Sequence, residues 1–109
     1  MNIETSEQGG SVVVALAGEV DLQHSPKLRK VLMELMLERR PVIVDMAGVA
    51  YIDSSGIAGL VEAYQMARRQ AGRFTLAAVS QPAMRVLQLA RLDKVFAIAD
   101  TVAAALGSV

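Results

Sequence analysis

The chain has 109 residues, of which 53% are apolar, and its formal net charge is zero. This length predicts a single domain over residues 1–109, and the absence of cysteine excludes disulfides, thiolate metal sites and cysteine nucleophiles. Scattered basic residues, with only two Phe and two Tyr, argue against nucleic-acid binding. Every apolar run ends before the ~20 residues that a membrane-spanning helix needs. We therefore expect a cytoplasmic domain with no secretory signal, no membrane insertion and no nucleic-acid partner.

The first part of the chain has the pattern of a β-hairpin. Residues 11–17 are mostly apolar and β-branched, and the Gly9-Gly10 pair that precedes them is typical of a turn. Residues 2–6 form a possible edge strand on the other side of this turn. The segment Gly18-Glu19-Val20-Asp21 then leads out of the strand.

A helix is expected to begin at Ser25-Pro26, where Ser25 can cap the helix and proline suits its first position. We place Arg39 and Arg40 in its last turn, where positive charge complements the helix dipole, and Pro41 ends it. The apolar residues that share one face of this helix are Leu28, Val31, Leu32, Leu35 and Met36.

Strand and helix patterns alternate through the rest of the chain. A buried strand is expected at 42–45, a turn around Gly48, and a helix that ends near Ala71-Gly72. The later elements are a strand at 74–79, a helix opened by Ser80-Gln81-Pro82, a strand at 95–98 and a helix at 102–106. This order predicts an α/β domain with a mixed, mainly parallel sheet of four to five strands covered by about four helices.

The segment Asp53-Ser54-Ser55-Gly56 lies where a loop becomes a helix. Like Asp21 and Asp45, it falls at the carboxyl end of an expected strand, where the functional groups of a parallel sheet collect. The first amide groups of a helix lack intrahelical partners and carry partial positive charge, so Asp53 or Ser54 can cap them. By composition alone, such a segment is most often only a helix cap. A phosphate on Ser54 would nevertheless be tolerated there, because helix N-termini bind anions, and it would add about −1.5 to −2 charges.

Three segments resemble the STAS family, the bacterial anti-sigma-factor antagonists of partner-switching regulation, and they do so in order and spacing over almost the whole chain. The first is Gly18-Glu19-Val20-Asp21, and the second is Val42-Ile43-Val44-Asp45 followed by Tyr51-Ile52-Asp53-Ser54-Ser55-Gly56. The third is Leu89-Ala90-Arg91-Leu92-Asp93-Lys94-Val95-Phe96.

The resemblance implies a phosphorylation switch centred on Ser54. A GHKL-type anti-sigma serine kinase would phosphorylate Ser54, and a phosphatase would reverse the modification. The unphosphorylated form would bind the kinase and release its sigma factor or other client. Asp21, Asp53, Ser55 and Gly56 would belong to the partner-facing surface, with Gly56 allowing close backbone approach. No cofactor or catalysis is implied for this chain, since ATP and Mg²⁺ would be ligands of the kinase.

Other functions remain as alternatives. Where switch proteins of the family often carry Gly-Leu-Gly, this chain has Gly56-Ile57-Ala58-Gly59. Similar sequences also resemble STAS subunits on the ATPase of bacterial lipid-transport ABC systems, where the serine need not be a kinase substrate. A hydrolase using Ser54 and His24 lacks the Gly-x-Ser-x-Gly turn, and we expect His24 to be a solvated loop residue. Asp21, Asp45 and Asp53 could offer oxygen ligands to a metal, but they are better explained as caps and surface carboxylates.

Overall fold

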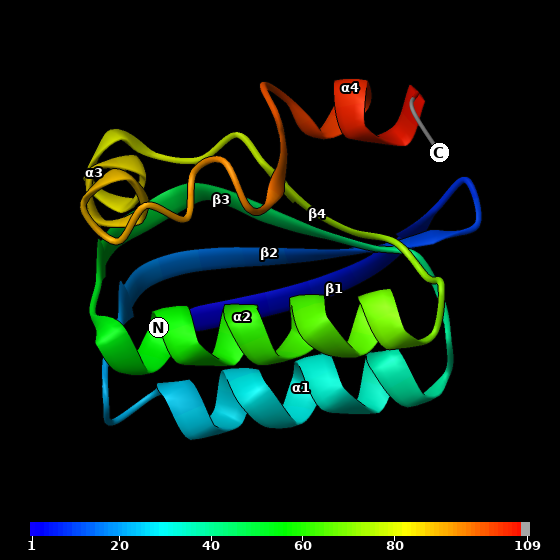
Figure 1. Ribbon diagram of the computed structural model, residues 1–109, viewed down its shortest axis with the longest axis horizontal. Helices are drawn as coiled ribbons and strands as arrows, with labels where there is room; N and C mark the ends of the chain where they lie inside the picture. The colour runs from blue at the N-terminus through cyan, green and yellow to red at the C-terminus, as the bar shows by residue number, and fades with distance from the viewer. Residues whose placement is uncertain (108–109) are drawn as a thin grey trace.

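The computed structural model describes residues 1–107, so the last two residues of the expected domain, 108 and 109, lie outside the described part. The elements follow the predicted order of strands and helices (Figure 1). The strands are β1 (Asn2–Gln8), β2 (Ser11–Val20), β3 (Val42–Ile52), β4 (Phe74–Ala77) and β5 (Ala97–Ala99). The helices are α1 (Ser25–Leu37), α2 (Ser54–Arg69), α3 (Gln81–Leu89) and α4 (Val102–Gly107). No helix among these residues is long and apolar enough to cross a membrane.

One five-stranded sheet, in the order β1-β2-β3-β4-β5, forms the centre of the molecule. β1 and β2 are antiparallel and are joined at Gly9 and Gly10, whose φ angles of 57° and 84° explain why glycine occupies both positions. The pairs β2–β3, β3–β4 and β4–β5 are all parallel. The predicted mixed, mainly parallel sheet is therefore confirmed.

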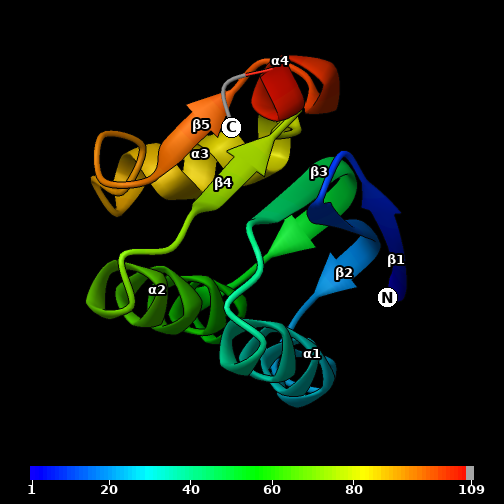
Figure 2. The same cartoon turned by 90° about the vertical axis from the view of Figure 1, so that its right-hand side faces the viewer.

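Helices cover both faces of the sheet (Figures 1 and 2). α1 and α2 lie side by side against one face, where Leu32 and Leu60 pack with Val14 in the larger core cluster. α4 lies against the opposite face, where Ala105 packs with Val13 in a smaller cluster. Because successive side chains of a strand point to opposite faces, a strand buried on both faces is apolar throughout, as β2 is from Val12 to Val14.

The predicted turn around Gly48 is wrong, because β3 continues through this residue to Ile52. A Cβ atom at Gly48 would lie only 2.9 Å from the Cβ of Ala17 on β2. The glycine therefore serves a close approach of two strands next to a shift in their register. As a result, β2 and β3 end side by side, with Val20 opposite Ile52.

The helix ends differ from the sequence prediction in three places. Ser25 is the first residue of α1, and His24 occupies the capping position without a side-chain hydrogen bond to the helix. α1 ends at Leu37, so Arg39 and Arg40 lie beyond its last turn. After α2, the left-handed backbone conformation is taken by Ala71, with a φ of 55°, and not by the glycine that follows it.

The start of α3 agrees with the prediction. The Ser80 hydroxyl accepts a hydrogen bond from the amide of Ala83, at 3.4 Å, and donates one to the carbonyl of Val49, at 2.6 Å. The cap of α3 is thus also bonded to the second half of β3. This contact holds α3 beside the end of β3 that leads to α2 (Figure 1).

Ser11 offers a test of the packing at the start of β2. Its side chain is completely buried, and its hydroxyl has no hydrogen-bond partner among the described residues. Ser11→Ala removes an unsatisfied polar group, and we expect it to raise the free energy of unfolding by about 1 kcal/mol. Urea unfolding measures the change. Ser80→Ala is the control, because that hydroxyl has two partners and its loss should destabilise by about 1 kcal/mol. Equal destabilisation by both variants would contradict the assignment.

Candidate functional site

Asp53 caps the N-terminus of α2. Its backbone is extended, and its Oδ1 accepts hydrogen bonds from the amides of Ser55 and Gly56, at 3.0 and 3.3 Å. The amide of Asp53 in turn donates to the carbonyl of Val20 at 3.2 Å, which ties the cap to the end of β2. Of the two capping residues that the sequence allows, the structure selects Asp53.

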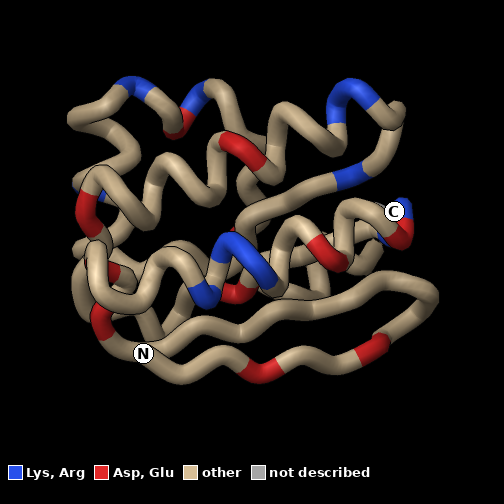
Figure 3. Tube along the Cα trace, turned by 90° about the horizontal axis from the view of Figure 1, so that it is seen from below, with Lys and Arg blue, Asp and Glu red and all other residues tan. Residues whose placement is uncertain are grey.

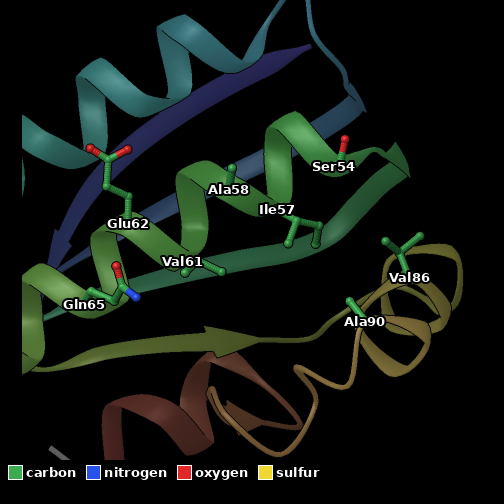
Figure 4. Close-up of a pocket in the computed structure, with 8 residues that line it drawn as sticks. All are labelled: Ser54, Ile57, Ala58, Val61, Glu62, Gln65, Val86 and Ala90. Carbon is green, nitrogen blue, oxygen red and sulfur yellow. The ribbon is translucent and has the colours of Figure 1, made fainter.

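Ser54 is the first residue of α2 and is exposed. Because Asp53 already satisfies the first amides of the helix, the Ser54 hydroxyl is not needed as a cap. Within residues 1–107 its hydroxyl takes part in no hydrogen bond with another group of the protein, and Figure 4 shows its side chain at the start of the helix. The purely structural explanation of Ser54 as a capping residue therefore does not hold.

The neighbouring residue, Ser55, differs from Ser54 in both its burial and its hydrogen bonding. It is half-buried, and its Oγ donates a hydrogen bond to Oδ1 of Asp53 at 2.5 Å. This bond and the two amide bonds all converge on one carboxylate oxygen. Ser55 therefore supports the cap, and Ser54 is the hydroxyl that is free to react with or contact another molecule.

The pKa of Asp53 lies below its ordinary value. The hydrogen bond from the Ser55 hydroxyl is the largest cause; burial opposes it, and backbone hydrogen bonds from Gly56, Ser55 and Leu22 lower the pKa further. Asp53 is therefore a carboxylate at neutral pH. Because Leu22 lies in the loop between β2 and α1, this loop also contributes to the low pKa of Asp53.

Asp21 and His24 form a second polar pair in that loop, which was not predicted from the sequence. Oδ1 of Asp21 accepts from the amide of His24 at 3.1 Å and lies 2.7 Å from Nδ1 of its ring. Burial raises the pKa of Asp21, but the hydrogen bonds from His24 and Gln23 lower it more in sum, so it too lies below its ordinary value. His24 lies in the loop, as predicted, but it is half-buried and bonded to Asp21 instead of fully solvated. Asp21 and His24 are three residues apart just before the start of α1, and this spacing was the feature of the sequence that could have predicted the bond.

The backbone at Gly56 approaches the sheet closely. A Cβ atom there would lie 2.8 Å from Cγ1 of Val20 and 2.9 Å from Cγ1 of Ile52. Gly56 is buried, so the close approach predicted for a partner is made to the protein's own β2 and β3. Gly56 therefore holds Ser54 and Asp53 against the ends of these strands.

A groove of about 520 Å³ begins at Ser54 and runs between α2 and α3 (Figure 4). Its walls are mainly apolar. The lining residues are Ser54, Ile57, Ala58, Val61, Glu62, Gln65, Val86 and Ala90. Glu62 is held by Arg29 of α1, with a shortest nitrogen–oxygen distance of 2.6 Å. An added charge at Ser54 would therefore lie at the mouth of an apolar groove.

The acidic residues do not form a metal site in the described part of the chain. Asp45 lies within β3, where its Oδ1 accepts a hydrogen bond from the amide of Ala47 at 3.1 Å. The prediction that Asp45 falls at the carboxyl end of its strand is therefore wrong, because β3 continues to Ile52. Asp21 and Asp53 follow neighbouring strands, as predicted. Basic and acidic segments are interspersed along the Cα trace in Figure 3, with no continuous basic stretch in that view.

The close approach at Gly56 predicts that Gly56→Ala destabilises the domain. The added methyl group must displace side chains of β2 and β3 that are fixed in the core, at a cost of about 1–3 kcal/mol. Gly59→Ala in the same helix is the matched control. A Cβ atom at Gly59 meets nothing within 4 Å. The control should therefore stabilise the helix by about 0.5–1 kcal/mol. Thermal and urea unfolding measure both variants, and a stable Gly56→Ala domain would refute the packing argument.

The lowered pKa of Asp53 predicts a specific dependence of stability on pH. A carboxyl whose pKa is lower in the folded state stabilises the fold above its unfolded pKa, about 3.9, and loses this contribution as pH falls through the folded pKa. Asp53→Asn keeps a good capping side chain but cannot titrate. Wild type should be the more stable at pH 7, and its advantage should begin to shrink near pH 4 and decrease further below it. Urea unfolding of both proteins from pH 7 to pH 2 measures the difference in their free energies of unfolding. A difference that stayed constant over this range would contradict the prediction.

Comparison with known proteins gives a consistent result. The family model described as "STAS domain" matches residues 2–105. The chain is 26% identical over 98 residues to the anti-sigma-B factor antagonist of Bacillus subtilis (strain 168), covering 90% of each chain. An anti-sigma factor antagonist from Mycobacterium paratuberculosis has a similar structure, with a TM-score of 0.89 and 24% identity, covering 99% of this chain and 92% of that chain.

The anti-sigma factor antagonist SpoIIAA also shares the fold, at 20% identity. In its unphosphorylated form the TM-score is 0.82, covering 96% of this chain and 93% of that chain. For the phosphorylated form of this Bacillus cell fate determinant it is 0.77, with 98% of each chain covered. The match of the family model over nearly the whole chain, together with the five-stranded mixed sheet, shows that this chain belongs to the STAS domain family.

Proposed function

We propose that this protein is an anti-sigma-factor antagonist that acts as a phosphorylation-controlled binding switch. The observation that carries the proposal is the division of roles at the start of α2: Asp53 caps the helix, and the exposed Ser54 hydroxyl is left uncommitted. A residue with a structural duty could not be modified without cost to the fold. Ser54 has no such structural role. Curated relatives of this chain are named anti-sigma factor antagonists.

Phosphate on Ser54 would change the surface more than the fold. The N-terminus of α2 provides partial positive charge that tolerates an anion. The phosphate would add about −1.5 to −2 charges beside the carboxylate of Asp53 and at the mouth of the groove between α2 and α3. A partner that buries this area would then have to bury two adjacent anionic groups, which costs binding energy unless each is paired.

The partners of such a switch are proteins with complementary roles. An anti-sigma serine kinase of the GHKL type would bind the unphosphorylated form and transfer phosphate to Ser54, and a phosphatase would remove it. ATP and Mg²⁺ would be bound by the kinase, so this chain supplies a docking surface and an acceptor hydroxyl in the cytoplasm without catalysis of its own. Asp21, Asp53 and Ser55 would shape the docking surface, with Gly56 supporting it from below.

Capture from the source cell tests the switch. Baits carrying Ser54→Ala, Ser54→Asp and no substitution are compared, with the phosphorylation of each bait read by intact mass. The Ser54→Asp bait should recover a serine kinase at least about tenfold less than the Ser54→Ala bait, because the added carboxylate lies in the contact area. Ser6→Asp on the exposed strand β1 is the control and should behave as wild type.

The same experiment separates the switch from a constitutive assembly role. If Ser54→Ala and Ser54→Asp recover the same partners in equal amounts, the switch is refuted. If those partners are subunits of a lipid-transport ABC system, the chain is an assembly subunit of that ATPase.

A further inference from the structure

Five exposed apolar and basic residues lie on the second half of α3 and in the turn that follows it. We call Arg85, Leu89, Arg91, Lys94 and Val95 the α3 patch. Leu89 is 85% exposed and Val95 is 44% exposed. The segment after the helix turns back on itself, with the amide of Val95 bonded to the carbonyl of Leu92 at 3.0 Å.

The exposure of Leu89 is not explained by the packing of α3. This helix already buries Ala83 and Leu87 in the core, and Phe96 is buried just after the turn. Leu89 lies on another side of the helix and contributes nothing to that core. A single exposed leucine is common, but here a second apolar side chain and three cations accompany it.

The cations of the α3 patch are available for an outside partner. Within the described residues, none of Arg85, Arg91 and Lys94 takes part in an ion pair, whereas Arg29 and Arg40 are paired with Glu62 and Glu7. Between residues 81 and 96 the only carboxylate in the sequence is Asp93. The patch is therefore basic as well as apolar.

The α3 patch adjoins, through Leu89, the groove that begins at Ser54. Val86, Leu89 and Ala90 have the i, i+3, i+4 spacing that places residues on one face of a helix. Val86 and Ala90 form the α3 wall of the groove (Figure 4), so Leu89 extends that wall outward. A partner lying in the groove would reach the α3 patch without leaving this helix.

We propose that the α3 patch binds an acidic amphipathic segment of the protein partner. The apolar side chains of this segment would contact Leu89 and Val95, and its carboxylates would pair with Arg85, Arg91 and Lys94. The proposal rests on the proposed function, because it assigns the patch to the partner that Ser54 controls. A membrane surface is the poorer fit. A helix that lies in a membrane needs a broad apolar face, and the apolar face of α3 is already buried.

Two short fluorescent helical peptides test the charge preference. Both carry leucines on one face; the other face carries glutamates in one peptide and lysines in its counterpart. Fluorescence anisotropy with the full chain should show binding of the acidic peptide only. Binding should weaken as NaCl increases, because salt screens exposed charges. In spectra of ¹⁵N-labelled protein, the amide shifts should change at residues 85–95.

Variants locate the site. Arg85→Glu with Lys94→Glu, and separately Leu89→Ser, should each weaken binding of the acidic peptide by about tenfold or more. Arg91 is left unchanged because its φ of 59° places it in a strained conformation. Lys27→Glu with Lys30→Glu on α1 makes the same change of charge on another exposed surface and should leave binding unchanged. Circular dichroism checks that each variant is folded.

Three results would overturn the proposal: equal binding of both peptides, equal weakening by the α1 control, or shift changes outside the patch. Binding to vesicles of anionic phospholipid that the patch variants abolish, without peptide binding, would assign the patch to a membrane instead. These outcomes are independent of the Ser54 baits. If the acidic peptide binds at the patch but the Ser54→Ala and Ser54→Asp baits recover the kinase equally, only the switch is refuted. If the two baits differ as expected but the peptide does not bind at the patch, only the patch proposal is refuted.

Discussion

The hydrogen bonds that converge on one oxygen of Asp53 organise the functional end of this domain. The amides of Ser55 and Gly56 and the Ser55 hydroxyl all donate to Oδ1 of this carboxylate. The amide of Asp53 is bonded to Val20, so the start of α2 is fixed to the end of β2. Because these bonds satisfy the first turn of the helix without Ser54, the Ser54 hydroxyl can lie exposed on a rigid support.

Close packing under the site explains how a change of charge could act without unfolding the domain. Gly56 brings α2 against Val20 and Ile52, and Gly48 brings β3 against Ala17. These contacts are internal and would be unaffected by a group added to the outer surface of α2. A site supported in this way presents one fixed geometry to a partner, so that modification alters electrostatics while the shape is kept.

The surface near this site combines an apolar groove with two kinds of charge. Carboxylates lie on the β2–α1 loop and at the start of α2. Around the end of α3 lie cations that form no ion pair within residues 1–107. Binding across such a surface would be specific because a partner must match both the apolar groove and the order of the charges. A phosphate at Ser54 would change one end of this pattern and leave the other end as it was.

Local patterns in the sequence were sufficient for the order of elements, the Gly9-Gly10 hairpin, the start of α3 and the mixed sheet. The predictions failed where a glycine or a pair of basic residues is compatible with more than one local structure. Gly48 was interpreted as a turn although it serves a close strand contact, and Arg39 and Arg40 suited a helix end that comes earlier, at Leu37. The bond between Asp21 and His24 was missed because it depends on how the loop folds back before α1.

The sequence by itself determined the fold class and placed Asp53 and Ser54 at a helix start, because both follow from local periodicity and from motifs of the STAS family. Only the tertiary structure decided which of the two caps the helix and what Gly56 approaches. Those answers depend on Val20 and Ile52, which are brought under α2 by the parallel pairing of β2 with β3. Contacts between segments that are distant in the chain leave no local pattern from which they could be predicted.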